Sequence, residues 1–260
     1  MDMNLYANST LIVAVLFFGV LACIELGRRF GKRLQKQGTD PSKSGTGAVD
    51  AAVFGLLGLL IAFTFSGAAA RFDARRMQIV TEANAIGTAY LRVDLLPAET
   101  QPEIRDLFRA YTDARLGVYR AIPDMEKVRA QQASAAAIQE KLWAKGVAAC
   151  GKSPSPAVMS LMVPAMNEMF DVATLRTAAA DLHVPTIVMA MLFMIAMGCA
   201  LLAGFDMSAA KGRSLMHYLG FALLIALAVF VILDLEFPRR GLIRVDSFDF
   251  YIEGVRAGMR

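Results

Sequence analysis

Four long runs of apolar residues constrain the fold more than any other feature of the sequence. The runs cover residues 11–27, 50–70, 184–205 and 215–234. A helix needs about 20 mainly apolar residues to cross the hydrocarbon core of a bilayer, so each run is a candidate transmembrane span. Hydrophobic residues make up 56% of the chain, above the roughly 45–50% that is usual for a soluble domain. The sequence therefore predicts an all-α, multi-pass membrane protein with four transmembrane helices.

The long segment between the second and third spans is predicted to form an extramembrane bundle of four helices. Its apolar residues recur with helical spacing, as at Ile104, Phe108 and Tyr111. Thr100, followed three residues later by Glu103, fits a capping box at the start of the second of these helices. The first helix continues the second span, and the fourth leads into the third span, so the bundle is expected to be continuous with both.

The expected domain organisation follows from these elements. Residues 1–70 hold the first two spans and a basic connecting loop. Residues 71–182 form the bundle, residues 183–234 hold the last two spans, and residues 235–260 form a C-terminal tail.

Charged residues beside the spans predict an orientation in the bacterial cytoplasmic membrane. Basic residues dominate the loop between the first two spans, where the only acid is Asp40: Arg28, Arg29, Lys32, Arg33, Lys36 and Lys43. Lys211 and Arg213 lie between the last two spans. Short loops rich in Lys and Arg stay in the cytoplasm, which places both termini and the bundle outside. The same distribution accounts for the net charge of +4, so we expect no nucleic-acid partner.

The sequence shows no arrangement that indicates catalysis or metal binding. The only histidines, His183 and His217, are far apart, and Cys23, Cys150 and Cys199 have no metal-ligand spacing. No nucleophile–base pair and no phosphate-binding loop is visible. We therefore expect neither an enzyme nor a cofactor, and no metal site.

Small residues recur every four positions in the second span. They form a narrow stripe on one side of a helix: Gly58, Ala62, Ser66 and Ala70. The third span has a similar stripe at Ala196, Ala200 and Gly204. Such stripes let two helices approach closely. The second-span stripe either packs against another helix or lines a pore or a subunit interface, and the sequence leaves both interpretations open.

Three arginines follow the second span directly, at Arg71, Arg75 and Arg76. One interpretation is a collar at the lipid head groups. The other is a basic pore mouth that concentrates anions when several copies assemble.

Polar residues on the first and fourth helices of the bundle are predicted to form hydrogen-bonded ties across it. The candidates are Glu82, Asn84, Asn167, Asp171 and Arg176.

Several short motifs resemble the bacterial bestrophin-like family of unknown function. They are the segments 60–67 (LIAFTFSG), 71–76 (RFDARR), 82–86 (EANAI), 167–171 (NEMFD) with Arg176, and 234–238 (DLEFP) with Gly241. The resemblance extends from the second span to the C-terminal tail.

The resemblance implies a function and a second view of the orientation. Bestrophins are pentameric ion channels with four transmembrane helices per subunit, and their second helix lines the pore through a hydrophobic neck of period four. On this chain the neck maps onto Gly55, Leu59 and Phe63. Leu59 and Phe63 suit a constriction that gates by dewetting, whereas Gly55 presents no side chain. Bestrophins hold the region between helices two and three in the cytosol, the reverse of what the charges predict.

The sequence and the resemblance together support two possible functions. The first is a homo-oligomeric, bestrophin-like channel in the lipid bilayer, a pentamer by analogy, that passes small anions along the second span. The alternative is a non-conducting membrane scaffold or envelope sensor whose bundle binds a protein partner or a ligand.

Overall fold

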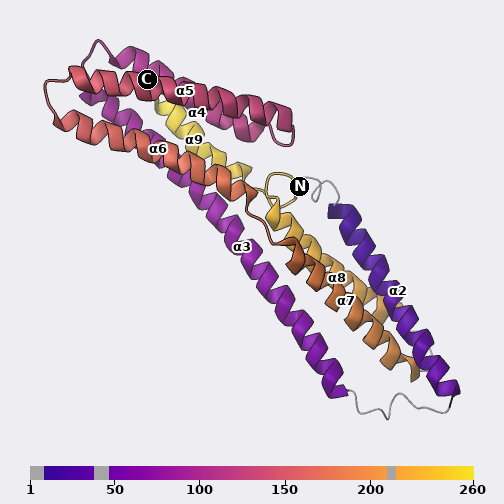
Figure 1. The fold of residues 1–260 in the computed structure, drawn as a ribbon. Coiled ribbons are helices and arrows are strands. Elements are labelled where there is room, and N and C mark those ends of the chain that lie inside the picture. Colours follow the sequence, from indigo (N-terminus) through magenta and orange to yellow (C-terminus); the bar gives the residue numbers. More distant parts are fainter. Residues whose placement is uncertain (1–8, 38–46, 210–214) are drawn as a thin grey trace. The chain divides into compact units, whose positions relative to one another are not determined.

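The computed structural model describes residues 9–37, 47–209 and 215–260, and it is built from helices (Figure 1). Its described part contains no β-strand. The chain divides into two compact units. Unit 1 consists of Met1–Ala70 and His183–Phe237, and unit 2 consists of Arg71–Leu182 and Pro238–Arg260. Of the basic loops that predicted the orientation, Asp40, Lys43, Lys211 and Arg213 lie outside the described residues.

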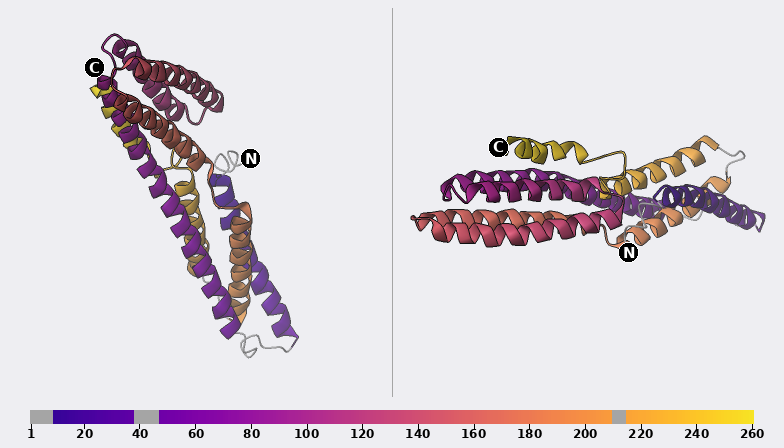
Figure 2. Two further views of the ribbon diagram at one scale, coloured as in Figure 1. Left: turned by 60° about the vertical axis from the view of Figure 1, so that its left-hand side comes forward. Right: turned by 90° about the horizontal axis from the view of Figure 1, so that it is seen from above.

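Unit 1 contains the membrane spans. Within the described residues, four helices are long and apolar enough to cross a bilayer, which confirms the predicted number. They include α2 (Ser9–Lys36), the first part of α3 (Gly47–Leu91), α7 (Thr186–Asp206) and α8 (Leu215–Glu236). α2 packs against both α7 and α8, and the three run alongside one another (Figure 2). α2 extends beyond its apolar run because Arg and Lys are good helix formers.

Small residues bring α2 and α7 into backbone contact. A Cβ atom added to Gly204 of α7 would lie 1.9 Å from the carbonyl oxygen of Ile24. A Cβ atom on Gly27 of α2 would lie 2.0 Å from the carbonyl oxygen of Leu201. No side chain fits at these distances, so glycine is required at both positions. The third-span stripe of small residues thus serves helix packing within the chain.

Unit 2 is a helical bundle closed by the C-terminal tail. It contains the second part of α3, η2 (Arg92–Leu95), α4 (Gln101–Arg120), α5 (Met125–Lys152), α6 (Ala157–Asp181), η4 (Asp246–Asp249) and α9 (Phe250–Gly258). α5 packs against α4 and α6, and α9 packs against α4. The core is made of large buried side chains from several helices, among them Ile79, Ile86, Phe108, Tyr111, Met166 and Ile252. The last residue is held too, because its carbonyl oxygen accepts hydrogen bonds from Tyr90 Oη (2.5 Å) and Arg109 Nη1 (2.9 Å).

Two local expectations need correction or refinement. The capping-box prediction at Thr100 is wrong, because its hydroxyl donates to the Pro97 carbonyl oxygen (2.8 Å) and makes no cap bond to α4. Thr100 has helical φ and ψ, whereas a capping side chain needs extended backbone. α3 passes without a break from the span into the bundle, but residues 182–185 separate α6 from α7. Pro185 explains this interruption, since it lacks an N–H and disfavours helical backbone in the residue before it.

Candidate pore-lining helix and buried ion-pair network

The span of α3 has one packed side. Leu57, Thr64 and Ala68 are buried, and they share one face of the helix because they are seven and four residues apart. Two contacts tie this helix to its neighbours in unit 1. The Phe54 ring lies 6.1 Å from the ring of Phe221 on α8, edge to face. Cys199 Sγ on α7 lies 3.7 Å from the Val53 carbonyl oxygen.

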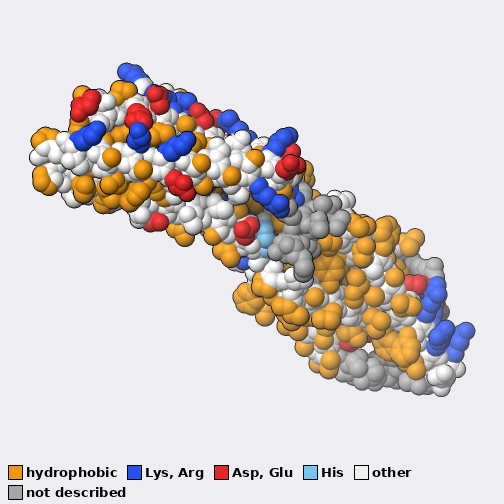
Figure 3. All heavy atoms as spheres, turned by 45° about the horizontal axis from the view of Figure 1, so that its top comes forward, with side chains coloured by type: hydrophobic (Ala, Val, Ile, Leu, Met, Phe, Trp, Pro, Cys, Tyr) orange, Lys and Arg blue, Asp and Glu red, His pale blue; other side chains and the backbone are white. Residues whose placement is uncertain are grey.

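The opposite side of the same span is open within the chain. The predicted neck residues Gly55, Leu59 and Phe63 are all exposed, with 52% of Leu59 and 67% of Phe63 accessible. A large apolar side chain that is exposed in one copy of a membrane protein is covered by lipid or by another subunit. Hydrophobic side chains dominate the visible face of unit 1 (Figure 3).

The small-residue stripe of α3 lies on this open side as well. Gly58, Ala62, Ser66 and Ala70 are all exposed, and a Cβ atom on Gly58 would have no neighbour within 4 Å. Among the described residues, the stripe therefore has no helix packed against it, unlike the stripe of α7. The sequence left two interpretations open, packing against another helix or lining a pore or a subunit interface, and for this stripe the second of them would involve a further copy of the chain.

Of the three arginines after the span, Arg75 and Arg76 make contacts within unit 2. Arg75 is buried and donates hydrogen bonds to the carbonyl oxygens of Ala179 (3.1 Å) and Leu182 (2.6 Å), which closes the end of α6. Arg76 pairs with Asp73 at 3.0 Å, and its guanidinium lies 4.4 Å from the centre of the Phe248 ring. Arg71 is half-buried. Arg75 thus stabilises the end of α6 whether the three arginines form a head-group collar or a pore mouth.

A buried ion-pair network lies in the interior of unit 2. Six charged side chains form it, and positive and negative charges alternate along the chain of contacts: Arg115, Glu82, Arg176, Asp249, Arg239 and Asp246. Glu82 is fully buried and accepts from Arg115 Nε at Oε1 and from Arg176 Nη1 at Oε2, both at 2.6 Å. Arg176 Nη2 also reaches Asp249 Oδ1 at 3.2 Å. The chain of contacts therefore leads from α3 through α4 and α6 to the tail.

Arg239 completes the network from the start of the tail. Its Nη1 and Nη2 donate to the two carboxylate oxygens of Asp249 at 2.9 and 2.8 Å, a bidentate arrangement. Nη1 also reaches Asp246 Oδ1 at 3.1 Å. The three arginines and three acids of the network balance in charge, and the exposed Arg244 adds a contact to Asp246 at its edge (2.7 Å). This balance is what allows so many ionised groups to be buried together.

Tyr119 lies in the centre of the network. Arg115 Nη2 donates to its hydroxyl at 2.8 Å, and the guanidinium of Arg176 lies 3.5 Å from the centre of its ring. Burial opposes ionisation of Glu82, but Arg115 and Arg176 outweigh it and hold the pKa of Glu82 below its usual range. Burial and the neighbouring Glu82 raise the pKa of Tyr119. At neutral pH the carboxylate is therefore charged and the phenol neutral.

The sequence identified only part of this network. Of the predicted ties, Glu82 and Arg176 meet across the bundle. Asn167 instead donates to Asp171 at 2.8 Å on the same helix, and Asn84 is exposed. The sequence analysis did not predict the other members of the network, which are Arg115, Arg239, Asp246 and Asp249. A signal existed for Arg115, since it lies four residues after Tyr111 and four before Tyr119, on the apolar face of α4.

The described residues contain no group of three or more His, Cys, Asp or Glu side chains that could hold a metal ion. The acids of the network are instead matched by arginines. The chain thus combines apolar spans with a helical bundle that holds a buried ion-pair network. These features define a class: helical, multi-pass membrane proteins with an extramembrane domain.

Comparison with known proteins identifies the family. A model of the bestrophin-like domain matches residues 13–249, so this chain belongs to the bestrophin-like family. Two solved structures of mutants of a bacterial bestrophin homolog from Klebsiella pneumoniae are similar in fold, each with a TM-score of 0.69 and 16% sequence identity. The alignments cover 95% and 94% of this chain and 97% and 98% of the homolog chains. No curated protein matches.

Proposed function

We propose that this protein is a homo-oligomeric ion channel of the bacterial cytoplasmic membrane, and that the span of α3 lines its path. One observation carries the proposal. α3 packs through Leu57, Thr64 and Ala68 and leaves its opposite side, with Leu59 and Phe63, open within the chain. In a ring of subunits, a helix packed on one side only presents its other side to the central axis or to the next subunit.

The chemistry of the open side suits a gated path. Leu59 and Phe63 lie one turn apart and would form two apolar rings around the axis of an oligomer. A narrow apolar ring blocks ions by losing its water and conducts when it widens. We propose small anions as the permeant ions and, by analogy with the family, a pentamer. A monomer that conducts nothing and binds a soluble partner through the bundle would support the scaffold alternative.

A conductance measurement tests the path. Purified oligomer is reconstituted into planar bilayers, and currents of the unaltered protein are compared with those of Phe63→Ala. Removing the larger neck side chain widens the constriction, so we expect at least a several-fold rise in open probability or conductance. The matched control is Met194→Ala on α7, a side chain that is also exposed in the single chain. Absence of current from well-folded oligomers of the unaltered protein and of every variant would contradict a channel.

We further propose the orientation that the basic loop indicates, with the bundle outside the cytoplasm. Cys150 is unsuitable as an accessible thiol because only 4% of it is exposed. A better probe is Ser134→Cys, at an exposed position of α5, in a chain whose three cysteines are replaced by alanine. Labelling of intact cells by a membrane-impermeant maleimide is expected. Labelling only after lysis would contradict this orientation and favour that of bestrophins.

A further inference from the structure

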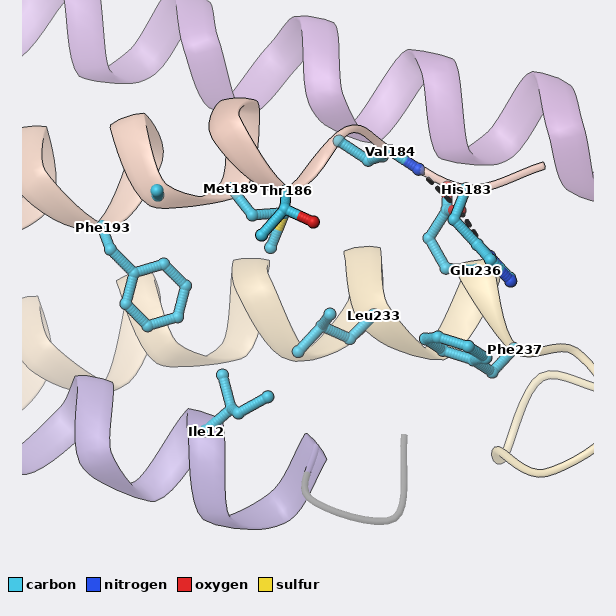
Figure 4. Close-up of a pocket in the computed structure, with 10 residues that line it drawn as sticks. Ile12, His183, Val184, Thr186, Met189, Phe193, Leu233, Glu236 and Phe237 are labelled. Atoms are coloured by element: carbon cyan, nitrogen blue, oxygen red, sulfur yellow. Dashed lines mark hydrogen bonds and ion pairs between the residues drawn. The ribbon is translucent and has the colours of Figure 1, made fainter. Parts of the chain in front are cut away.

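A cavity of about 210 Å³ lies within unit 1, between α2, α7 and α8 (Figure 4). Most of its wall is carbon. The lining residues are Ile12, His183, Val184, Thr186, Met189, Ala190, Phe193, Leu233, Glu236 and Phe237. An apolar cavity of about 150 Å³ in a soluble protein stays dry and binds small apolar molecules, so this one is large enough to hold a hydrocarbon group.

The polar groups of the cavity gather at one end. Glu236 is only 3% exposed, and its Oε2 lies 3.3 Å from both the Val184 N–H nitrogen and His183 Nδ1. The His183 ring packs against the ring of Phe237, with centres 4.6 Å apart. A carboxylate and an imidazole thus lie at one end of the cavity, beside Phe237, whereas Phe193 and Ile12 lie toward the other end (Figure 4).

The polarity of the cavity wall changes along the helices as the polarity of a bilayer changes with depth. The polar end coincides with the start of α7 at Thr186 and the end of α8 at Glu236, where ionisable groups of spanning helices reach the interface. Phe193 lies seven residues further along α7, about 10 Å deeper at 1.5 Å per residue. The cavity is therefore polar at head-group level and apolar at chain level.

We propose that this cavity is a lipid-binding site, which holds the first part of one acyl chain of a phospholipid with its head group at His183 and Glu236. The hydrocarbon of the bilayer surrounds these three helices, so acyl chains are the most abundant apolar groups that can enter. The carboxylate of Glu236 favours a head group that carries an ammonium donor, as phosphatidylethanolamine does, and disfavours an anionic head such as that of phosphatidylglycerol. The assignment does not depend on whether the protein conducts ions.

The test counts retained lipids on the purified full-length protein by native mass spectrometry. The protein is released from detergent after incubation with equal amounts of phosphatidylethanolamine and phosphatidylglycerol. We expect one phosphatidylethanolamine per chain on the unaltered protein, and at least a tenfold loss in Ala190→Phe, whose larger side chain fills the cavity. The control is Met194→Phe, four residues along α7, where the side chain is 65% exposed and does not line the cavity. It should retain the lipid.

Further variants separate the chain site from the head-group site. Glu236→Gln should keep a bound lipid but lose the preference for phosphatidylethanolamine. Thr186→Leu, a smaller change in the wall, should weaken retention if Ala190→Phe fails to fold as judged by circular dichroism. Equal retention in Ala190→Phe and Met194→Phe would overturn the proposal, as would detergent alone in the cavity. A change in oligomeric mass of Ala190→Phe without loss of lipid would assign the cavity to a subunit contact instead.

Discussion

Glu82→Gln removes the central carboxylate of the ion-pair network and changes little else in shape. Removing one partner of a buried ion pair costs about 3–5 kcal/mol, because the other charge stays buried without compensation. Arg176 keeps Asp249 at 3.2 Å, whereas Arg115 keeps only the Tyr119 hydroxyl and the Ala173 carbonyl oxygen. We therefore expect the lower end of the range, a loss of about 3 kcal/mol in the free energy of unfolding of the bundle.

The chain carries its own reporter for this measurement. Trp143 is its single tryptophan, and the ring centre lies 6.4 Å from that of Phe170 within unit 2. Urea titration of the full chain in detergent, followed by Trp143 fluorescence, should show the lower midpoint. The control is Asp73→Asn, which breaks an exposed pair with Arg76 and should cost less than about 1 kcal/mol. Equal shifts for the two variants would refute the buried network as a source of stability.

Comparing the unaltered protein with Glu82→Gln at different pH values gives a stability difference whose direction of change can be predicted. The folded state holds the pKa of Glu82 below its ordinary value of 4.5, so this carboxylate stabilises the fold above that pH. Its contribution is lost as the pH falls through the folded pKa. The difference in unfolding free energy between the unaltered protein and Glu82→Gln should therefore be constant near neutral pH and shrink below about 4.5. A difference that grows on acidification would contradict the assignment.

Two further outcomes follow from the packing. Arg239→Met should release the tail, which hydrogen exchange would detect as at least tenfold faster exchange in α9 with α5 unchanged. Arg244→Met removes only an exposed arginine's contact with Asp246 at the edge of the network, so it should change exchange in α9 far less. Gly204→Ala should lower the melting temperature of the spans, since its Cβ atom would lie 1.9 Å from a carbonyl oxygen, at a cost of about 3 kcal/mol or more. Gly198→Ala, with no neighbour within 4 Å, is the matched control and should not lower it.

The spans could be predicted from the sequence because an uninterrupted apolar run has few alternatives to a bilayer. The last two predicted spans, 184–205 and 215–234, end within two residues of α7 and α8. α2 was harder to delimit, because helix propensity carries it into the basic loop as far as Lys36. The break before α7 depends on Pro185, whose effect on the preceding residues is local and could have been predicted.

The rest depends on contacts that periodicity does not encode. The stripes of α3 and α7 look alike in sequence, yet in the described part of the chain Gly204 of the α7 stripe meets another helix and Gly58 of the α3 stripe does not. Asp249 pairs with Arg176 across 73 positions of the chain, and no local pattern indicates such a pairing. Arg115 is the exception, since a charge inside the apolar stripe of α4 indicates a buried partner.

The most direct test of the proposed path is modification of single cysteines on α3. Leu59→Cys and Phe63→Cys are made in the cysteine-free chain, with Leu57→Cys on the packed side of the same helix as the control. A charged, membrane-impermeant methanethiosulfonate reagent is added during recording in planar bilayers. The path through α3 requires that current through Phe63→Cys and Leu59→Cys changes irreversibly while Leu57→Cys is unaffected. Currents that ignore the reagent at both open-side positions would contradict it.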